Sequence, residues 1–321
     1  MANTTLRKAE SIVIITGTLK KKELQVKTFS GDEVLSGHLI VETSPGNEVR
    51  IDTYVNRMTR ATKDKPSYES AYWKNQKRMY DEYVSMAELM KNGLDEETAR
   101  QQATRFSVRA SLGLNDYVAR DGSLVSVPRI SSNFSFYSRI AEGTPFEPSA
   151  RFELEGYIAK MRPEMKGDDE TGRLLLDLIV PNYNGAAQPL SFVATEEASA
   201  YIGDHYEVGN TVQVYGEFVN RVNVVATRKA GFAREEISEQ KTYVSEMLID
   251  NGALEPYDED GPFAYKHEDI ETAMRVREME YLPSVKKKAA ERPVNNTAPA
   301  VSERPFVFAD VPSQPKPGFN Y

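Results

Sequence analysis

Alternating apolar and polar residues dominate two stretches of the chain, which run from about residue 12 to 139 and from 151 to 232. A period of two predicts β-strands with one buried face. Each stretch opens with an alternating strand that carries a glycine, Gly17 or Gly156, where the missing side chain lets a strand bend sharply. We interpret the two stretches as an internal repeat of one small β-domain.

The later landmarks of the two stretches occur in the same order. A hairpin turn rich in Gly, Pro and Asn comes next, at residues 44–47 in the first stretch and 181–185 in the second. A helical segment then precedes a final hairpin. The final hairpins are predicted at residues 111–118 with 124–129 and at residues 212–219 with 222–227. Each stretch is thus predicted to contain five strands, with a helix between the third and the fourth.

The helical segment of the first stretch is unusually long, and we place it at residues 66–106. Ser67 is the predicted N-cap of its first helix. The seam of this helix consists of Tyr72, Met79, Met86, Tyr83 and Met90. Gly93 ends the first helix, and Asp95 caps a second one that extends to about Arg105. The pattern predicts a helical hairpin whose aromatic stripe packs on the first β-domain.

Two further segments follow the repeat. Residues 234–251 are acidic and amphipathic and are followed by Gly252, so they are predicted to form a helix. Residues 283–321 contain seven prolines and are predicted to form a disordered tail. Pro-rich tails either bind other proteins or act as inert tethers. The candidate anchors for another protein are Phe306, Phe308, Phe319 and Tyr321.

The composition disfavours enzymes and metal proteins. Cys is absent, which removes disulfides, thiolate metal sites and thiol nucleophiles. The three histidines, His38, His205 and His267, are far apart and share no metal-binding spacing. The chain also lacks a phosphate-binding loop and a serine-hydrolase motif. We therefore expect no enzymatic activity, no catalytic or metal-binding residue and no cofactor.

The sequence also bears on location and on charged partners. No apolar run approaches the roughly 18 residues that span a membrane, and residues 1–10 lack the features of a secretory signal, so we expect a cytoplasmic protein and no membrane partner. The net charge of −8 disfavours a polyanionic partner. However, residues 1–230 hold 29 Lys or Arg against 31 Asp or Glu. A local basic groove is therefore compatible with this part of the chain.

The second stretch carries the residues that resemble a known family. Its two motifs are Leu154-x-Gly156-x-Ile158 and Val208-Gly209-x-x-Val212-x-Val214-x-Gly216. They resemble the oligonucleotide/oligosaccharide-binding (OB) domains of single-stranded-DNA-binding proteins of the bacteriophage replication and recombination type. The first stretch departs from this pattern, because it lacks the glycine that enters strand four and has the longer helical insert.

The resemblance implies a mainly β fold with α insertions. It consists of two tandem five-stranded OB-fold barrels, a helical hairpin inserted in the first, and a disordered C-terminal tail. The predicted boundaries are 1–140 for the first OB domain with its insert at 66–106, 141–150 for a linker, 151–232 for the second OB domain, 233–282 for an acidic helical segment and 283–321 for the tail.

Candidate binding residues follow from the way OB barrels bind extended strands. They use the outer face of strands two and three, with aromatic side chains for bases and cations for phosphates. Strand parity places Arg50 and Tyr54 outside the first barrel, and Tyr157 and Tyr215 outside the second. The predicted nucleic-acid-binding residues are Lys20, Lys21, Lys22, Arg50, Tyr54, Arg57, Tyr157, Lys160, Arg162, Arg173, Tyr215 and Arg228. Two interpretations stay open for Phe134, Phe136 and Tyr137, which form either an exposed stacking edge or a linker held on the core.

Together these features predict non-catalytic binding of single-stranded DNA with low sequence specificity, in phage-type DNA replication or recombination. The location is then the cytoplasm, that of the host if a phage encodes the protein. Replication or recombination proteins are further predicted partners, through the C-terminal tail. The alternative is a protein-binding adaptor or structural component that acts through the helical insert or the tail.

Overall fold

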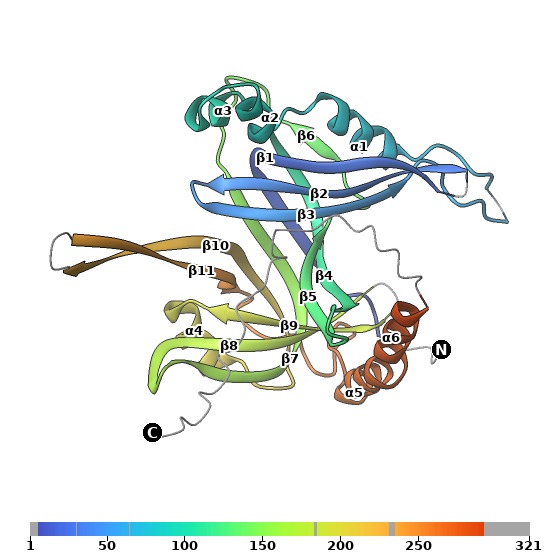
Figure 1. Cartoon of the computed structure of the whole chain (residues 1–321). Helices are drawn as coiled ribbons and strands as arrows, with labels where there is room; N and C mark the ends of the chain where they lie inside the picture. Colours follow the sequence, from blue (N-terminus) through green and yellow to red (C-terminus); the bar gives the residue numbers. More distant parts are fainter. Residues whose placement is uncertain (1–5, 30, 64, 183–184, 231–234, 292–321) are drawn as a thin grey trace.

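The chain is mainly β with short helices, as the sequence predicts (Figure 1). The computed structural model describes residues 6–291 except residues 30, 64, 183–184 and 231–234, and it describes only the backbone of the strands between residues 221 and 243. Within this part of the chain, 11 strands form one continuous hydrogen-bonded sheet.

Five strands of the first half pair in a closed cycle. They are β1 (Ser11–Phe29), β2 (Asp32–Ser44), β3 (Asn47–Asn56), β4 (Arg105–Val118) and β5 (Leu124–Ser131). β1 pairs with β2, β2 with β3, β3 in parallel with β5, β5 with β4, and β4 again with β1. The short strand β6 (Tyr137–Arg139) pairs with the first part of β4.

The second half repeats this cycle. Its strands are β7 (Ser149–Lys166), β8 (Asp169–Pro181), β9 (Ala187–Ala194), β10 (Thr211–Ala230) and β11 (Glu235–Gly252). β7 pairs with β8, β8 with β9, β9 in parallel with β11, β11 with β10, and β10 again with β7. Helix α4 (Glu196–His205) separates β9 from β10 and is capped by Thr195. In both halves, helical structure lies between the third and the fourth strand.

Main-chain and side-chain contacts join the two halves. Residues 11–16 of β1 pair antiparallel with residues 149–154 of β7. Farther along, the turn between β2 and β3 contacts β10, where Asn220 N donates to Oδ1 of Asn47 at 2.6 Å and Nδ2 of Asn47 donates to the carbonyl of Phe218 at 3.2 Å. The halves are therefore fixed at two places.

Strand β3 illustrates how alternation builds the core. Val49, Ile51 and Val55 are buried, whereas Tyr54 is 49% exposed. These orientations are the ones that strand parity predicts. Val49 and Ile51 belong to the main hydrophobic cluster, which continues into the second half, where it includes Phe192. Val55 packs with Leu35 and Trp73 in a smaller cluster.

Gly17 allows β1 to lie close to β2. A β-carbon at this position would lie 2.5 Å from Cγ1 of Val41 and 2.6 Å from the carbonyl oxygen of Glu42. No side chain fits at such distances, so the glycine is required for the approach. The register of β1 against β2 shifts soon after it, between Leu19 and Lys21.

The helical insert of the first half contains three helices, whereas a hairpin of two is predicted. They are α1 (Ala71–Glu82), α2 (Met86–Lys91) and α3 (Glu96–Gln102). The predicted N-cap of the first helix is also wrong. Ser70 caps α1 by accepting a hydrogen bond from the backbone of Trp73, while Oγ of Ser67 donates to the carbonyl of Thr59.

A capping box divides the first predicted helix. The chain leaves α1 at Tyr83, and the side chain of Ser85 accepts a bond from the backbone of Glu88 while Glu88 accepts one from the backbone of Ser85. This reciprocal pair starts α2 as a separate helix. The predicted cap Asp95 is confirmed at the start of α3.

The middle of the predicted seam is buried, whereas Tyr72 at its start is half-buried and Met90 at its end is exposed. Met79, Tyr83 and Met86 are at most 3% exposed, but Met90 is 45% exposed. Met79 and Tyr83 pack into the main core, whereas Met86 packs with α3 in a separate small cluster. The break before α2 therefore turns the last part of the seam away from the β-domain.

The segment predicted as an acidic helix is strand β11, and residues 212–227, predicted as a hairpin, lie within the single strand β10. The second cycle therefore extends to Gly252, past the predicted boundary at residue 232. Val244 and Leu248 are four residues apart, a spacing that fits one face of a helix and one face of a strand equally well. The pairing of β11 with β9 and β10 makes this segment a strand and not a helix, because tertiary contacts override helix propensity.

Helices close the described part of the chain. They are α5 (His267–Val276), a π-helical turn η1 (Arg277–Tyr281) and α6 (Leu282–Ala290). Ile270 and Ala273 of α5 are buried in the main core. Residues 283–290, predicted as part of a disordered tail, are thus helical, while the rest of that tail with its four aromatic residues lies outside the described residues. No helix that the structure describes is long and apolar enough to cross a membrane.

Candidate nucleic-acid interface

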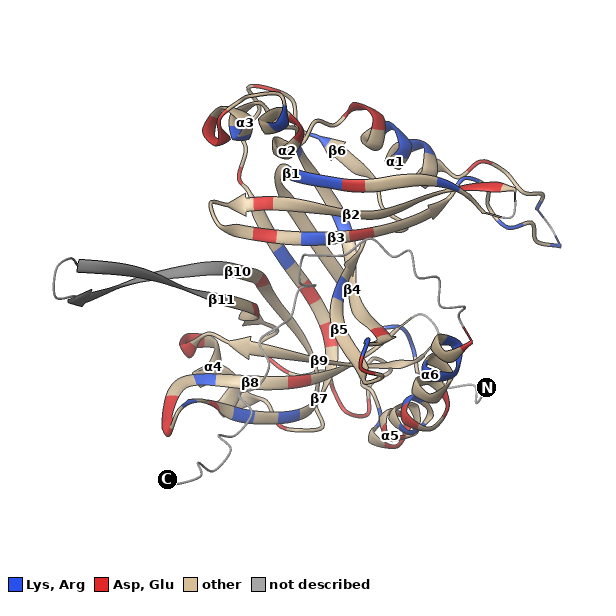
Figure 2. Ribbon diagram, viewed as in Figure 1, with Lys and Arg blue, Asp and Glu red and all other residues tan. Residues whose placement is uncertain are grey.

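The outer face of β2 and β3 brings together a basic and an aromatic residue, as predicted. Arg50 lies opposite Ile40, Asp52 opposite His38, and Tyr54 opposite Ser36. Arg50 and Tyr54 thus point away from the core on the same strand, four residues apart. Figure 2 shows basic and acidic positions following one another along β3.

Asp52 lies between two guanidinium groups on this face. Its carboxylate accepts a hydrogen bond from Nε of Arg50 at 3.0 Å and from Nε of Arg129, on β5, at 2.8 Å. We call these three residues the Asp52 clamp. Two positive charges face one negative charge, so the clamp carries one positive charge in excess. Both bonds use Nε, and the Nη groups make no hydrogen bond to another described residue.

Arg129 is the member of the clamp that the sequence analysis misses. Arg129 is the last residue of the final strand predicted in the first half. The alternation along that strand does not indicate which residue Arg129 contacts. The parallel pairing of β3 with β5, whose register pair is Asp52 and Ser131, brings Arg129 next to Asp52. Such a pairing joins strands that are far apart in sequence, and no local pattern reveals it.

A second polar group lies beside the clamp. Nζ of Lys21 is 2.6 Å from Oε1 of Glu23, and Nε2 of His38 is 2.9 Å from Oε2 of the same carboxylate. The hydrogen bond from Lys21 is the main cause that holds the pKa of Glu23 below its ordinary value. Burial lowers the pKa of His38, and the charge of Arg50 acts in the same direction. His38 is therefore neutral near pH 7.

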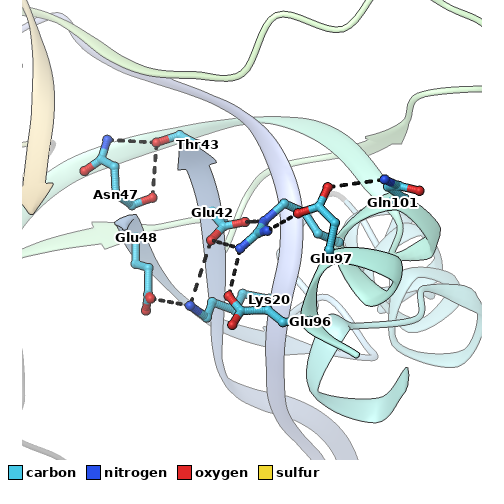
Figure 3. Close-up of polar contacts among 9 residues, drawn as sticks. Lys20, Glu42, Thr43, Asn47, Glu48, Glu96, Glu97 and Gln101 are labelled. Carbon is cyan, nitrogen blue, oxygen red and sulfur yellow. Dashed lines mark hydrogen bonds and ion pairs between the residues drawn. The ribbon is translucent and has the colours of Figure 1, made fainter. Parts of the chain in front are cut away.

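The other predicted cations of the first half are committed to contacts within the protein. Nζ of Lys20 is 2.5 Å from Oε1 of Glu48 and 3.9 Å from Oε1 of Glu42. Figure 3 shows Lys20 between these two carboxylates. Nζ of Lys22 donates to the carbonyls of Tyr80 and Tyr83 at 2.9 and 2.6 Å. These two lysines hold β1 to β2, β3 and α1.

Arg57 is paired in a similar way at the end of β3. Its Nη1 donates to Glu33 at 2.7 Å and its Nε to Glu69 at 3.0 Å. The two carboxylates raise the pKa of the guanidinium. Because two carboxylates face its single positive charge, Arg57 brings no positive excess to the face.

In the second half, the prediction that Tyr157 is exposed on the outer face is wrong. Its side chain is 4% exposed, and its hydroxyl is 2.7 Å from Nδ1 of His267 on α5. Burial raises the pKa of Tyr157. Tyr215 is half-buried, and the side chain of Arg228 lies outside the described residues.

The remaining cations of the second half differ in their partners. Nη1 of Arg162 donates to Asp177 at 2.6 Å, and Arg173 bridges Glu164 at 2.6 Å and Glu246 at 3.0 Å. Lys160 is exposed, and among the described residues it forms no ion pair. Arg173 thus ties β8 to β7 and β11. Among the predicted cations of this half whose side chains the structure describes, Lys160 is the one that remains available.

Two of the three aromatic residues left open by the sequence face solvent. Phe134 is 82% and Phe136 is 50% exposed, while Tyr137 is 1% exposed. The ring of Tyr72, on α1, lies 5.8 Å from that of Phe134 and 4.9 Å from that of Phe136. Both interpretations thus hold in part, because this segment is fixed on the core by Tyr137 and exposes the other two rings.

The described side chains contain no cluster of three or more His, Asp or Glu residues that could hold a metal ion. The acidic run of residues 168–170 is an exposed turn at the start of β8.

Comparison with known proteins places the chain in a family. The model of the YorF family matches residues 10–288, which is well over half of the sequence. The chain belongs to the YorF family. A comparison with curated proteins gave no match.

Two solved structures are similar to this chain at low sequence identity. A deletion mutant of the single-stranded DNA binding protein from Thermus aquaticus is 12% identical, with a TM-score of 0.41 over 79% of this chain and 98% of that chain. The wild-type protein from Thermus aquaticus is 15% identical, with a TM-score of 0.37 over 71% of this chain and 100% of that chain.

Proposed function

We propose that the protein binds single-stranded DNA without catalysis and with low sequence specificity, along the outer face of β2 and β3. The observation that carries this proposal is the Asp52 clamp beside the exposed ring of Tyr54. We place the activity in phage-type DNA replication or recombination, the setting that the sequence resemblance implies.

The strand pairings support this choice of face. Each half has a closed cycle of five strands with helical structure between the third and the fourth, and we propose that each cycle is an OB-fold barrel. In OB barrels, ligands bind on the outer face of the second and third strands. In the first half these strands are β2 and β3, which carry the clamp.

The chemistry of the clamp suits a phosphodiester backbone. A guanidinium group has five N–H donors in a planar fork, and Arg50 and Arg129 each use one of them for Asp52. The Nη donors that remain can bond to phosphate oxygens, and the positive excess attracts them. The ring of Tyr54 can stack on a base, which requires a base whose face is not covered by its neighbours in a duplex.

The second half supports a smaller share of the binding. Of its two predicted aromatic platforms, Tyr157 is buried and Tyr215 is half-buried. Its cations Arg162 and Arg173 are paired with carboxylates. We propose that Lys160 adds a phosphate contact there and that the first half supplies most of the affinity.

Fluorescence anisotropy of labelled oligo-dT and of a duplex, titrated with salt, tests the proposal. We expect a preference for oligo-dT and a loss of affinity as salt rises, because phosphate contacts release counterions. The double variant Arg50→Ala/Arg129→Ala removes two such contacts and should reduce the slope of log affinity against log salt by roughly 1.4. Arg151→Ala, which breaks an exposed ion pair with Asp250, is the matched control.

Two results would contradict the proposal. One is equal and weak binding of oligo-dT and duplex at every salt concentration, which would favour the adaptor hypothesis. The other is a salt slope that the double variant leaves at the value of the wild type.

A further inference from the structure

Three aromatic rings form an exposed patch next to the proposed DNA-binding face. Tyr72 contacts Phe134 edge-on at 5.8 Å and Phe136 in a tilted arrangement at 4.9 Å. Phe134 and Phe136 remain 82% and 50% exposed. We call these three residues the aromatic ledge. The large apolar side chains that the segment between β5 and β6 exposes are all rings.

The backbone that carries the ledge is held by buried hydrogen bonds. Nε2 of Gln76, on α1, donates to the carbonyls of Ser132 at 2.7 Å and Ser135 at 3.2 Å. Gln76 is fully buried, and its Oε1 accepts a bond from Oγ1 of Thr53 at 2.5 Å. The same amide therefore ties α1, β3 and the segment that carries the rings.

Further bonds fix the far end of this segment. Tyr137 N donates to Oδ1 of Asn75 at 2.7 Å, and Nδ2 of Asn75 donates back to the carbonyl of Tyr137 at 3.1 Å. The hydroxyls of Tyr137 and Ser132 are 2.6 Å apart. Phe134 and Phe136 thus lie between two anchored points. Rings held in this way lose little conformational entropy when a ligand covers them.

The ledge continues the proposed DNA-binding face. Tyr54 N donates to Oδ1 of Asn133 at 2.8 Å, and Ser132 N donates to the carbonyl of Asp52 at 2.9 Å. The residue before Phe134 is thus bonded to the backbone of Tyr54, and the clamp residue Asp52 is bonded to the segment itself. A single DNA strand that runs along β3 past Tyr54 therefore reaches the ledge next.

We propose that the aromatic ledge stacks the bases of the DNA strand that leaves Tyr54, which extends the binding site from β3 onto the segment between β5 and β6. This inference rests on the proposed function. Exposed rings next to a strand face that carries cations suit bases, because every base has a face that can stack on an aromatic ring. Lys74, on α1, lies two residues after Tyr72 and is 64% exposed, and its Nζ is 3.3 Å from Oε2 of Glu69.

Phe134→Ala tests the ledge in the full-length chain. Losing one stacked base should weaken binding of oligo-dT by about fivefold to 150-fold. The salt slope should stay unchanged, since no charge is removed, and this separates the ledge from the clamp. Phe134→Leu keeps apolar volume without a ring and should also lose affinity. Leu254→Ala, at a position 75% exposed in the second half, should bind as the wild type does.

A fluorescent variant reports contact directly. Phe134→Trp adds a solvent-facing indole to a chain whose single tryptophan, Trp73, is 4% exposed. Stacking of a base should quench the added fluorescence when oligo-dT is titrated in, and the wild type should show much less quenching.

The outcomes distinguish the ledge from the function on which it rests. If the wild type binds oligo-dT in a salt-dependent manner but Phe134→Ala and Phe134→Leu bind equally well, the ledge proposal is overturned and the proposed function stands. If Phe134→Leu retains the affinity that Phe134→Ala loses, the site needs apolar volume, and stacking is overturned. If the wild type shows no preference for oligo-dT, both proposals fail.

Discussion

Arg277 and Asp116 form an ion pair in which the side chains are only 6% and 2% exposed. Arg277 belongs to η1, between α5 and α6, and Asp116 belongs to β4 in the first half. The same guanidinium lies 3.3 Å from Oγ of Ser126 on β5, and its charge lies over the ring of Tyr281. The C-terminal helices are thus tied to the first half by a pair that water hardly reaches.

We predict that Arg277→Ala lowers the free energy of unfolding by about 3–5 kcal/mol, because it leaves the Asp116 carboxylate buried without its partner. Denaturation with urea, followed by circular dichroism, measures this change. The control is Arg151→Ala, whose pair with Asp250 is exposed and should contribute less than about 1 kcal/mol. Equal effects of the two variants would show that burial does not determine the strength of the Arg277 pair.

Asp52→Asn should strengthen DNA binding. The carboxylate repels phosphate and occupies one donor of Arg50 and one of Arg129, and the amide removes the negative charge. We expect about a fivefold gain in affinity for oligo-dT, which corresponds to roughly 1 kcal/mol for one charge at close range in water. Anisotropy at low salt measures it. Weaker binding by Asp52→Asn would mean that the clamp acts by positioning its arginines and not by its charge.

Tyr157→Phe should change stability and leave DNA binding unaltered. The variant removes the hydroxyl that bonds to His267 and keeps the buried ring, so the free energy of unfolding should fall by about 0.5–1.5 kcal/mol. Urea denaturation and anisotropy are measured on the same preparation. A loss of affinity with unchanged stability would restore Tyr157 to the binding site.

Stability should fall as the pH drops from about 7 to about 5.5, in part through His38. Burial and the charge of Arg50 lower the pKa of His38 in the folded state, with an opposing effect of Glu23. The unfolded chain then binds a proton at His38 more readily than the folded chain does. The contribution of His38 to the free energy of unfolding is therefore present above the ordinary pKa of about 6.5 and is lost as the pH falls below it. His38→Gln should flatten the dependence of the free energy of unfolding on pH in this window. Parallel curves for the variant and the wild type would contradict this account.

The alternation of apolar residues predicts much of the first half of the fold. Along β3 it separates the buried Ile51 from the outward Arg50 and Tyr54 correctly, because one face of this strand meets the core and the other meets solvent. At β7 the same alternation does not predict exposure, since Gly156, Tyr157 and Ile158 are all buried. Here α5 packs on the face that is expected to meet solvent.

The part of the candidate site that the sequence hides depends on partners that are distant along the chain. The role of Lys20 is an example, because the sequence shows three consecutive lysines and gives no hint that Glu48 neutralises one of them. Arg129 is the opposite case, since it becomes part of the face only through the pairing of β5 with β3. Local patterns therefore predict which residues face outward, and long-range pairing determines which charges remain available.

The first part of β1 has a hydrogen-bonded neighbour on each side, since residues 13–16 pair with β4 and also with β7. A hinge between the halves would have to break one of these ladders at the centre of the sheet. The protein should therefore behave as a stiff template, and a flexible oligonucleotide that contacts both halves has to adopt the curvature that the template imposes.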